Sequence, residues 1–116
     1  MTKTTRKDKR IQRKKRIRAK IAGNATKPRL VVFRSNKHLY AQLIDDEKGQ
    51  VLAASSDVKI KSEQKRTNIA KEVAKNIAEK AKEQKIGNIV FDRGGYKYHG
   101  QVKVLAQELR KQGIAF

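Results

Sequence analysis

A repeat of apolar side chains between residues 64 and 85 restricts the possible folds of this chain more than any other feature. Apolar residues recur there at every fourth position, and lysines and glutamates occupy the opposite side. Such spacing places the apolar side chains on one face of an α-helix. The repeat predicts an amphipathic helix over residues 64–85, with Ser62 as its N-cap and Gly87 ending it in the left-handed conformation. The repeating residues are Ile69, Val73, Ile77 and Ala81.

Four shorter segments have the composition of β-strands, and turn-forming residues separate the first three. A second amphipathic helix is expected over residues 102–109, ending before Gly113. The order is therefore β-β-β-α-β-α, in which the strand that follows the first helix pairs parallel with an earlier strand. We expect a small α/β (α+β) domain with a mixed sheet and two helices packed on it. The strand segments are 30–34, 39–44, 51–56 and 88–91.

Positive charge is concentrated at the start of the chain. Residues 1–20 hold 11 of the 30 Lys and Arg but one of the 11 Asp and Glu. Their few apolar side chains cannot offset the entropy lost on ordering, and like charges repel. We therefore divide the chain into a basic arm, residues 1–21, which we expect to be disordered when no partner is bound, and one globular domain, residues 22–116. Phosphates that neutralise the arm would allow it to form a helix.

The formal net charge of +19 points to a polyanionic partner, either nucleic acid or an anionic membrane. The absence of cysteine excludes thiolate catalysis and disulfides, and two histidines are too few for an ordinary metal site, so no cofactor is expected. No apolar run approaches the roughly 18 residues of a membrane-spanning helix. The arm also lacks an apolar face for a membrane surface. We expect a soluble, cytoplasmic protein that is a monomer when free.

The segment "FDRGGYKYHG", residues 91–100, is the first candidate site. A catalytic interpretation would pair Asp92 with His99, but the segment offers no serine or threonine as a nucleophile. A nucleotide-binding interpretation lacks both the P-loop spacing and the dinucleotide fingerprint. For RNA, the cationic residues would contact phosphates, the glycines would admit a backbone, and Tyr96 and Tyr98 would stack on bases. The alternative is that the tyrosines and Asp92 only brace a tight connection between strand and helix.

The turn "RSNKH", residues 34–38, is the second candidate site. It combines cations and hydrogen-bonding groups, and His38, Tyr40 and Gln42 alternate onto one strand face. The alternative is ordinary turn chemistry beside a solvated strand. A cluster of acids at residues 45–47 would repel phosphates, so we expect that turn to point away from RNA.

Three blocks, "KPRLVVFRSNKHLYAQLIDD", "TNIAKEVAKNIAEKAKEQKI" and "FDRGGYKYHGQVKVLAQELRKQGIAF", resemble the bacterial large-ribosomal-subunit protein eighteen family over essentially the whole chain. The resemblance implies a non-enzymatic structural protein that binds 5S rRNA. It would help attach that RNA to 23S rRNA in the central protuberance, beside a neighbouring 5S-binding ribosomal protein. One departure is Gln101, where the family commonly has arginine after "YHG".

The resemblance and the two candidate sites together give one set of expected RNA-binding residues. Two other functions stay open from the residues alone: an RNA-processing enzyme, and a non-specific basic nucleic-acid-binding protein. The expected set is Lys3, Arg6, Lys7, Lys9, Arg10, Arg13, Lys14, Lys15, Arg16, Arg18 and Lys20 in the arm, and Lys27, Arg29, Arg34, Ser35, Asn36, Lys37, His38, Tyr40, Gln42, Arg93, Gly94, Gly95, Tyr96, Lys97, Tyr98, His99 and Gly100 in the domain.

Overall fold

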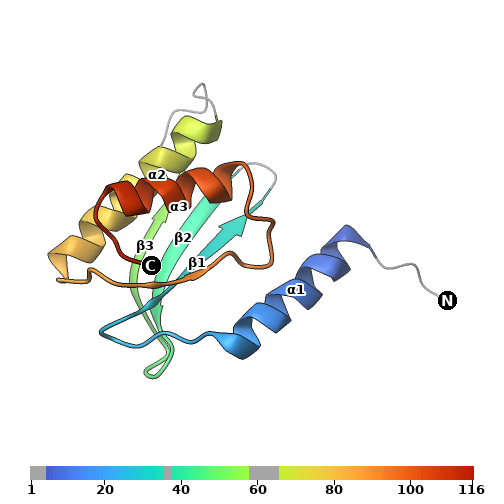
Figure 1. Ribbon diagram of the computed structural model, residues 1–116, viewed down its shortest axis with the longest axis horizontal. Helices are drawn as coiled ribbons and strands as arrows, with labels where there is room; N and C mark the ends of the chain where they lie inside the picture. Colours follow the sequence, from blue (N-terminus) through green and yellow to red (C-terminus); the bar gives the residue numbers. More distant parts are fainter. Residues whose placement is uncertain (1–4, 36–37, 58–65) are drawn as a thin grey trace.

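The computed structural model describes residues 5–35, 38–57 and 66–116 (Figure 1). Four residues discussed above, Lys3, Asn36, Lys37 and Ser62, lie outside these described residues. The elements are α1 (Arg6–Lys20), β1 (Arg29–Arg34), β2 (Leu39–Asp45), β3 (Gln50–Ser56), α2 (Arg66–Glu83), β4 (Val90–Asp92) and α3 (Gln101–Lys111).

The four strands form one mixed sheet in the order β3-β2-β1-β4. The first three strands are antiparallel, and β4 pairs parallel with β1. The expected mixed sheet is thus confirmed, and the expected order β-β-β-α-β-α holds from β1 to α3, with α1 preceding it. The parallel pairing follows from the crossover through α2, which returns the chain to the start of the sheet before β4 begins.

Two helices, α2 and α3, cover one face of the sheet (Figure 1). Their apolar stripes meet alternate residues of β1 and β2 in one core, where Leu30, Leu43, Val73 and Leu105 are at most 1% exposed. Burying a side chain of this size contributes about 1.5–3 kcal/mol, so this layer supplies most of the stability. The opposite face of the sheet is more open, and Phe33 on that face is 48% exposed.

The end of α2 corrects one expectation. Lys85, rather than Gly87, has the left-handed conformation, with φ of 60°. The amide of Ile86 donates to the carbonyl of Ala81, and that of Lys85 donates to Lys82, which is the Schellman pattern. Ile86 is 5% exposed, and its burial in the core requires the chain to turn before it reaches Gly87.

The arm contains the helix α1. Thr5 and Asp8 form a capping box at its N-terminus, in which each side chain accepts a hydrogen bond from the other residue's backbone amide. The hydrogen bond from the Thr5 backbone amide is the main cause of a lowered pKa at Asp8. None of the residues of α1 is buried. The helix therefore has local reasons to form but no apolar face in the core, and its disorder without RNA stays a prediction.

Candidate nucleic-acid interface

The loop after β4 is divided into a buried half and an exposed half. In the buried half, Asp92 is fully shielded from solvent. Its Oδ1 accepts the backbone N–H of Gly94 at 2.8 Å, and its Oδ2 accepts Nη1 of Arg29 at 2.8 Å. Residues 97–100 are all exposed, including Tyr98 at 43%. The bracing interpretation thus describes Asp92, Gly94 and Gly95, whereas the half-buried Arg93 and the exposed residues 97–100 are open to a ligand.

Arg29 is used within the fold, and it therefore does not belong to an exposed binding surface. The residue is 7% exposed and its guanidinium lies between Asp92 and Asp46. Burial acts to lower the pKa of Arg29, but hydrogen bonds to the two carboxylates outweigh it and the pKa is raised. A guanidinium already held by two carboxylates at 2.8–3.1 Å has few donors left for phosphate.

Tyr96 connects the two candidate sites, the turn at residues 34–38 and the segment at residues 91–100. Its hydroxyl accepts the backbone N–H of Arg34 at 3.0 Å and donates to the carbonyl of the same residue at 2.8 Å. The guanidinium groups of Arg10 and Arg34 lie 4.9 and 5.5 Å from the centre of its ring. Because cations already lie against this ring, Tyr96 connects the arm, β1 and the loop after β4.

The glycine pair in the loop receives α1. Nη1 of Arg10 donates to the carbonyl of Gly94 at 3.3 Å, and Nε of Arg13 donates to that of Gly95 at 2.9 Å. A Cβ at Gly95 would lie 2.5 Å from the carbonyl oxygen of Arg10, and φ there is +80°. Only glycine allows this approach of helix and loop, so Gly95 is explained by the docking of α1 within the protein.

Asp46 holds the C-terminal end of α1 through Arg18. Its carboxylate lies 3.6 Å from Nη2 of Arg18, accepts the backbone N–H of Gly23 at 2.7 Å, and also accepts Arg29. The hydrogen bond from Arg29 is the main cause of a lowered pKa at Asp46, although burial opposes it. The acidic turn therefore contributes one carboxylate that fixes the chain where α1 ends and the domain begins.

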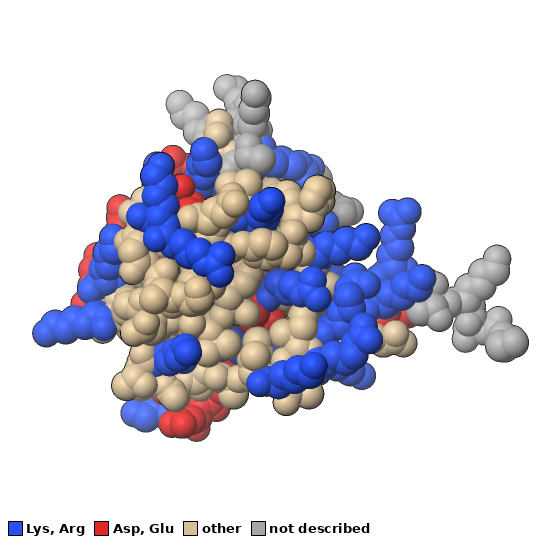
Figure 2. Space-filling view, viewed as in Figure 1, with Lys and Arg blue, Asp and Glu red and all other residues tan. Residues whose placement is uncertain are grey.

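The cations of α1 fall into two groups. Arg10, Arg13 and Arg18 face the domain and donate to protein oxygens. The other described cations of the helix are exposed, and Figure 2 shows Lys and Arg gathered over α1, away from the acids at the α2 edge. The three cations that face the domain are all arginines, since a planar guanidinium suits fixed hydrogen bonds better than an ammonium does. The exposed group is Arg6, Lys7, Lys9, Lys14, Lys15, Arg16 and Lys20.

The first hairpin contains both turn chemistry and exposed polar groups. The Ser35 hydroxyl accepts the backbone N–H of His38 at 3.1 Å, as the turn interpretation expects. Nδ1 of His38 lies 3.0 Å from Oδ1 of Asp57, so this ring is oriented by the protein. Arg34 is exposed, as is Gln42 on the open face of the sheet.

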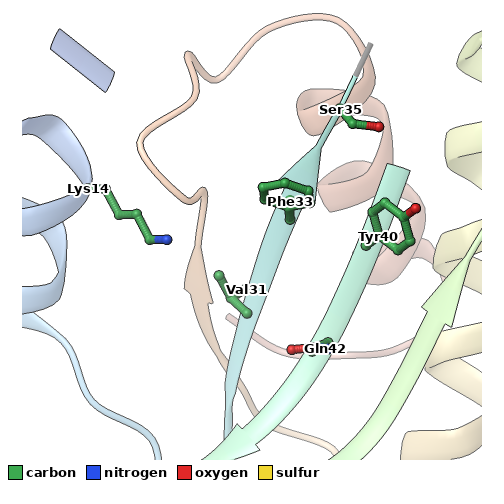
Figure 3. Close-up of a pocket in the computed structure, with 6 residues that line it drawn as sticks. All are labelled: Lys14, Val31, Phe33, Ser35, Tyr40 and Gln42. Atoms are coloured by element: carbon green, nitrogen blue, oxygen red, sulfur yellow. The ribbon is translucent and has the colours of Figure 1, made fainter. Parts of the chain in front are cut away.

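A groove of about 450 Å³ lies between α1 and the open face of the sheet (Figure 3). The strands form its floor, where Phe33 is paired directly with Tyr40, and Val31 with Gln42. Phe33 was not among the expected site residues, because it ends an apolar run that is typical of a buried strand. Its exposed position follows from the alternation of side chains within that run. The groove is lined by Lys14, Val31, Phe33, Ser35, Tyr40 and Gln42.

The described residues contain neither a membrane-spanning helix nor a cluster of metal ligands. Within residues 5–35, 38–57 and 66–116, no helix combines the length and the apolar composition needed to cross a bilayer. The same ranges contain no group of three His, Asp or Glu side chains placed to hold a metal ion.

Comparison with known proteins identifies the family of this chain. Residues 4–116 match the family described as ribosomal L18 of archaea, bacteria, mitochondria and chloroplasts. The chain belongs to the ribosomal L18 family. It is 52% identical over 117 residues to large ribosomal subunit protein uL18 of Petrotoga mobilis, covering 94% of this chain and 96% of that relative. It is 50% identical over 110 residues to the protein of the same name from Staphylococcus haemolyticus, covering 92% of both chains.

The departure noted at Gln101 has a structural explanation in this L18 chain. The residue is 8% exposed, and its Nε2 donates to the carbonyl of Arg66 at 3.1 Å. An amide at this position ties the first turn of α3 to the first turn of α2. Gln101 therefore supports the fold of this L18 protein.

Proposed function

We propose that this chain is a structural protein of the large ribosomal subunit that binds 5S rRNA and helps attach it to 23S rRNA. Its L18 relatives are named as large-subunit proteins. The observation that carries the proposal is that α1, the loop after β4 and the first hairpin adjoin one another. Arg10 and Tyr96 connect the three segments. The protein would act in the cytoplasm, within the ribosome and beside a neighbouring 5S-binding protein.

The basic arm and the domain take different parts in this proposal. The exposed cations of α1 neutralise phosphates without regard to sequence, since contacts to phosphates carry no sequence information. The domain recognises the shape of the RNA through fixed groups of the hairpin and the loop. The proposed domain contacts are Lys27, Arg34, Ser35, Asn36, Lys37, His38, Tyr40, Gln42, Arg93, Lys97, Tyr98, His99 and Gly100.

Several residues of the expected set receive another assignment. Arg29 is withdrawn because its guanidinium is buried between two carboxylates. Gly94, Gly95 and Tyr96 form the docking site of α1, and the three arginines that face this site or Asp46 orient the helix rather than contact RNA.

The alternative of an RNA-processing enzyme would depend on Asp92, the acid best placed at the end of a strand. A metal-dependent nuclease needs carboxylates that reach an open site. Asp92 is fully buried and bonded to Arg29 and Gly94, so it cannot serve there without disrupting the fold. We expect 5S rRNA to stay intact when it is incubated with the protein and Mg²⁺.

A salt titration tests the proposed function. Affinity for a bacterial 5S rRNA transcript is measured with excess competitor duplex RNA, for the full chain and for residues 22–116. Each neutralised phosphate contributes roughly 0.7–0.9 to the slope of log affinity against log salt, so removal of the arm should flatten the slope. The preference for 5S rRNA over duplex should persist. A preference that disappears with the arm would contradict recognition by the domain, and no preference in the full chain would favour the non-specific binder.

A further inference from the structure

The groove between α1 and the open sheet face combines an aromatic floor with polar groups and a cation. Phe33 is 48% exposed, and its ring centre lies 5.8 Å from that of Tyr40, with an angle of 43° between the planes. Figure 3 shows the two rings on neighbouring strands and Lys14 extending toward them from α1. Phe33 lies beside Val31 and Tyr40 in the groove lining, so the three side chains form one apolar patch. An apolar patch that is open to solvent indicates a contact surface.

The chemistry of the lining selects one kind of ligand. The two rings offer apolar faces on which a flat heterocycle stacks, and the Gln42 amide and Ser35 hydroxyl offer donors and acceptors to its edge. The Lys14 ammonium supplies positive charge where a phosphate would follow. A volume of about 450 Å³ lies within the range of roughly 300–1,000 Å³ that is usual for small-ligand sites.

We propose that this groove binds one unpaired nucleotide of the RNA, with its base against Phe33 and Tyr40 and its phosphate toward Lys14. The inference rests on the proposed function and names the part of the RNA that the open sheet face reads. The nucleotide would contact both α1, which supplies the Lys14 cation, and the domain, which supplies the Phe33 and Tyr40 rings.

Charge argues against the other occupants of such a groove. A second copy of this chain would bring a formal charge of +19 against the same charge, which opposes association. A partner helix would need a continuous apolar strip, whereas three of the six lining residues are Lys14, Ser35 and Gln42. A nucleotide can stack its base on the two rings and place its phosphate near the Lys14 ammonium.

The test compares Phe33→Ala with Val51→Ala. Val51 is the matched control because it is also a large exposed apolar residue, 53% exposed, and lies on β3 away from the groove lining. Stacking on one aromatic ring is worth roughly a 5- to 100-fold change in affinity. We expect Phe33→Ala to weaken binding of 5S rRNA by about tenfold, while Val51→Ala binds as the parent does. Dimethyl sulfate should modify one unpaired base in the Phe33→Ala complex that the parent protein protects.

A second probe separates this inference from the proposed function. An unstructured RNA hexamer that contains 2-aminopurine should lose fluorescence when its base stacks in the groove of the parent, and Phe33→Ala should abolish this quenching. If the parent shows no preference for 5S rRNA but still quenches the hexamer, only the proposed function fails. The nucleotide site is overturned if Phe33→Ala binds and protects 5S rRNA as the parent does. It is also overturned if the substitution instead abolishes self-association in sedimentation.

Discussion

The helices α1 and α3 are held by different forces. Six residues of α3 are buried, among them Leu105 and Leu109, which are fully shielded. The longer α1 has no buried residue and is fixed by hydrogen bonds from arginines in its middle to Gly94 and Gly95, and by an ion pair of Arg18 with Asp46 near its C-terminus. Apolar burial is insensitive to salt, whereas exposed charge contacts are screened by it. One chain therefore contains a permanent helix and a helix whose position can respond to its ionic surroundings.

The two helices also differ in the side chains that they leave exposed to a partner. In α3 the apolar face is packed into the core, and the exposed side chains that remain are Lys103, Gln107, Arg110 and Lys111. In α1 the docking contacts use three arginines and leave seven described cations exposed. A helix fixed by a few polar bonds can present nearly all of its charge, which a helix fixed by burial cannot do.

Leu105→Ala should give the largest effect, because it removes a fully buried side chain from the contact of α3 with the core. Substitutions of this kind cost about 2–5 kcal/mol. Lys103→Ala is the matched control on the exposed side of the same helix, and it should change the unfolding free energy by less than about 0.5 kcal/mol. Urea unfolding followed by circular dichroism measures both. Equal losses in the two variants would show that α3 is not held by burial.

Loss of the docking arginines should give an intermediate effect confined to α1. Arg10→Gln with Arg13→Gln removes two hydrogen bonds of about 0.5–1.5 kcal/mol each, so the helix should leave the glycine pair while the domain stays folded. The chain has no cysteine, and spin labels can be placed uniquely at Gln12→Cys and Glu79→Cys, both exposed. The distance distribution between them should broaden in the arginine variant.

Lys15→Gln with Arg16→Gln is the matched control for that experiment. It removes the same charge from the exposed side of α1. The label distance should stay as narrow as in the parent. A broad distribution in the parent itself would instead agree with an arm that is disordered without RNA, and equal broadening in the two variants would show that charge alone fixes the helix.

Acid should give the smallest effect, through Asp46. The pKa of this carboxyl is lowered in the folded protein, chiefly by the hydrogen bond from Arg29, so its ionisation favours folding above the ordinary aspartate pKa of about 3.9. That contribution is lost as the pH falls through the lowered folded pKa. Asp46→Asn should be less stable than the parent by about 1 kcal/mol at pH 7, and the gap should close as the pH falls below about 3.9 and through the lowered folded pKa. A gap that is constant from pH 7 to pH 2 would assign the effect to packing.

The elements held by burial were those that the sequence could predict. The four-residue repeat from Ile69 to Ala81 is a local signal, and α2 lies where it indicates. The alternating and β-branched segments likewise give the strands, and the mixed sheet follows from their order. Each of these inferences needs only neighbours in the chain.

The contacts of the candidate site could not be predicted in this way. Arg29 is indistinguishable in sequence from an RNA-binding cation, because the carboxylates that hold it are 17 and 63 residues away. The acceptors of Arg10 and Arg13 are backbone carbonyls, which every residue has and no pattern marks. Phe33 was missed for a related reason, since a continuous apolar run hides which of its side chains face outward.

The docking of α1 also has a consequence for the order of events during synthesis. The carbonyl that accepts Arg13 belongs to a residue 82 positions later in the chain. Translation proceeds from the N-terminus, so the arm emerges as a free cation well before its intramolecular acceptors exist. During that interval any nearby polyanion meets the arm without competition from the domain, and the helix acquires its fixed direction only after the loop following β4 has been made.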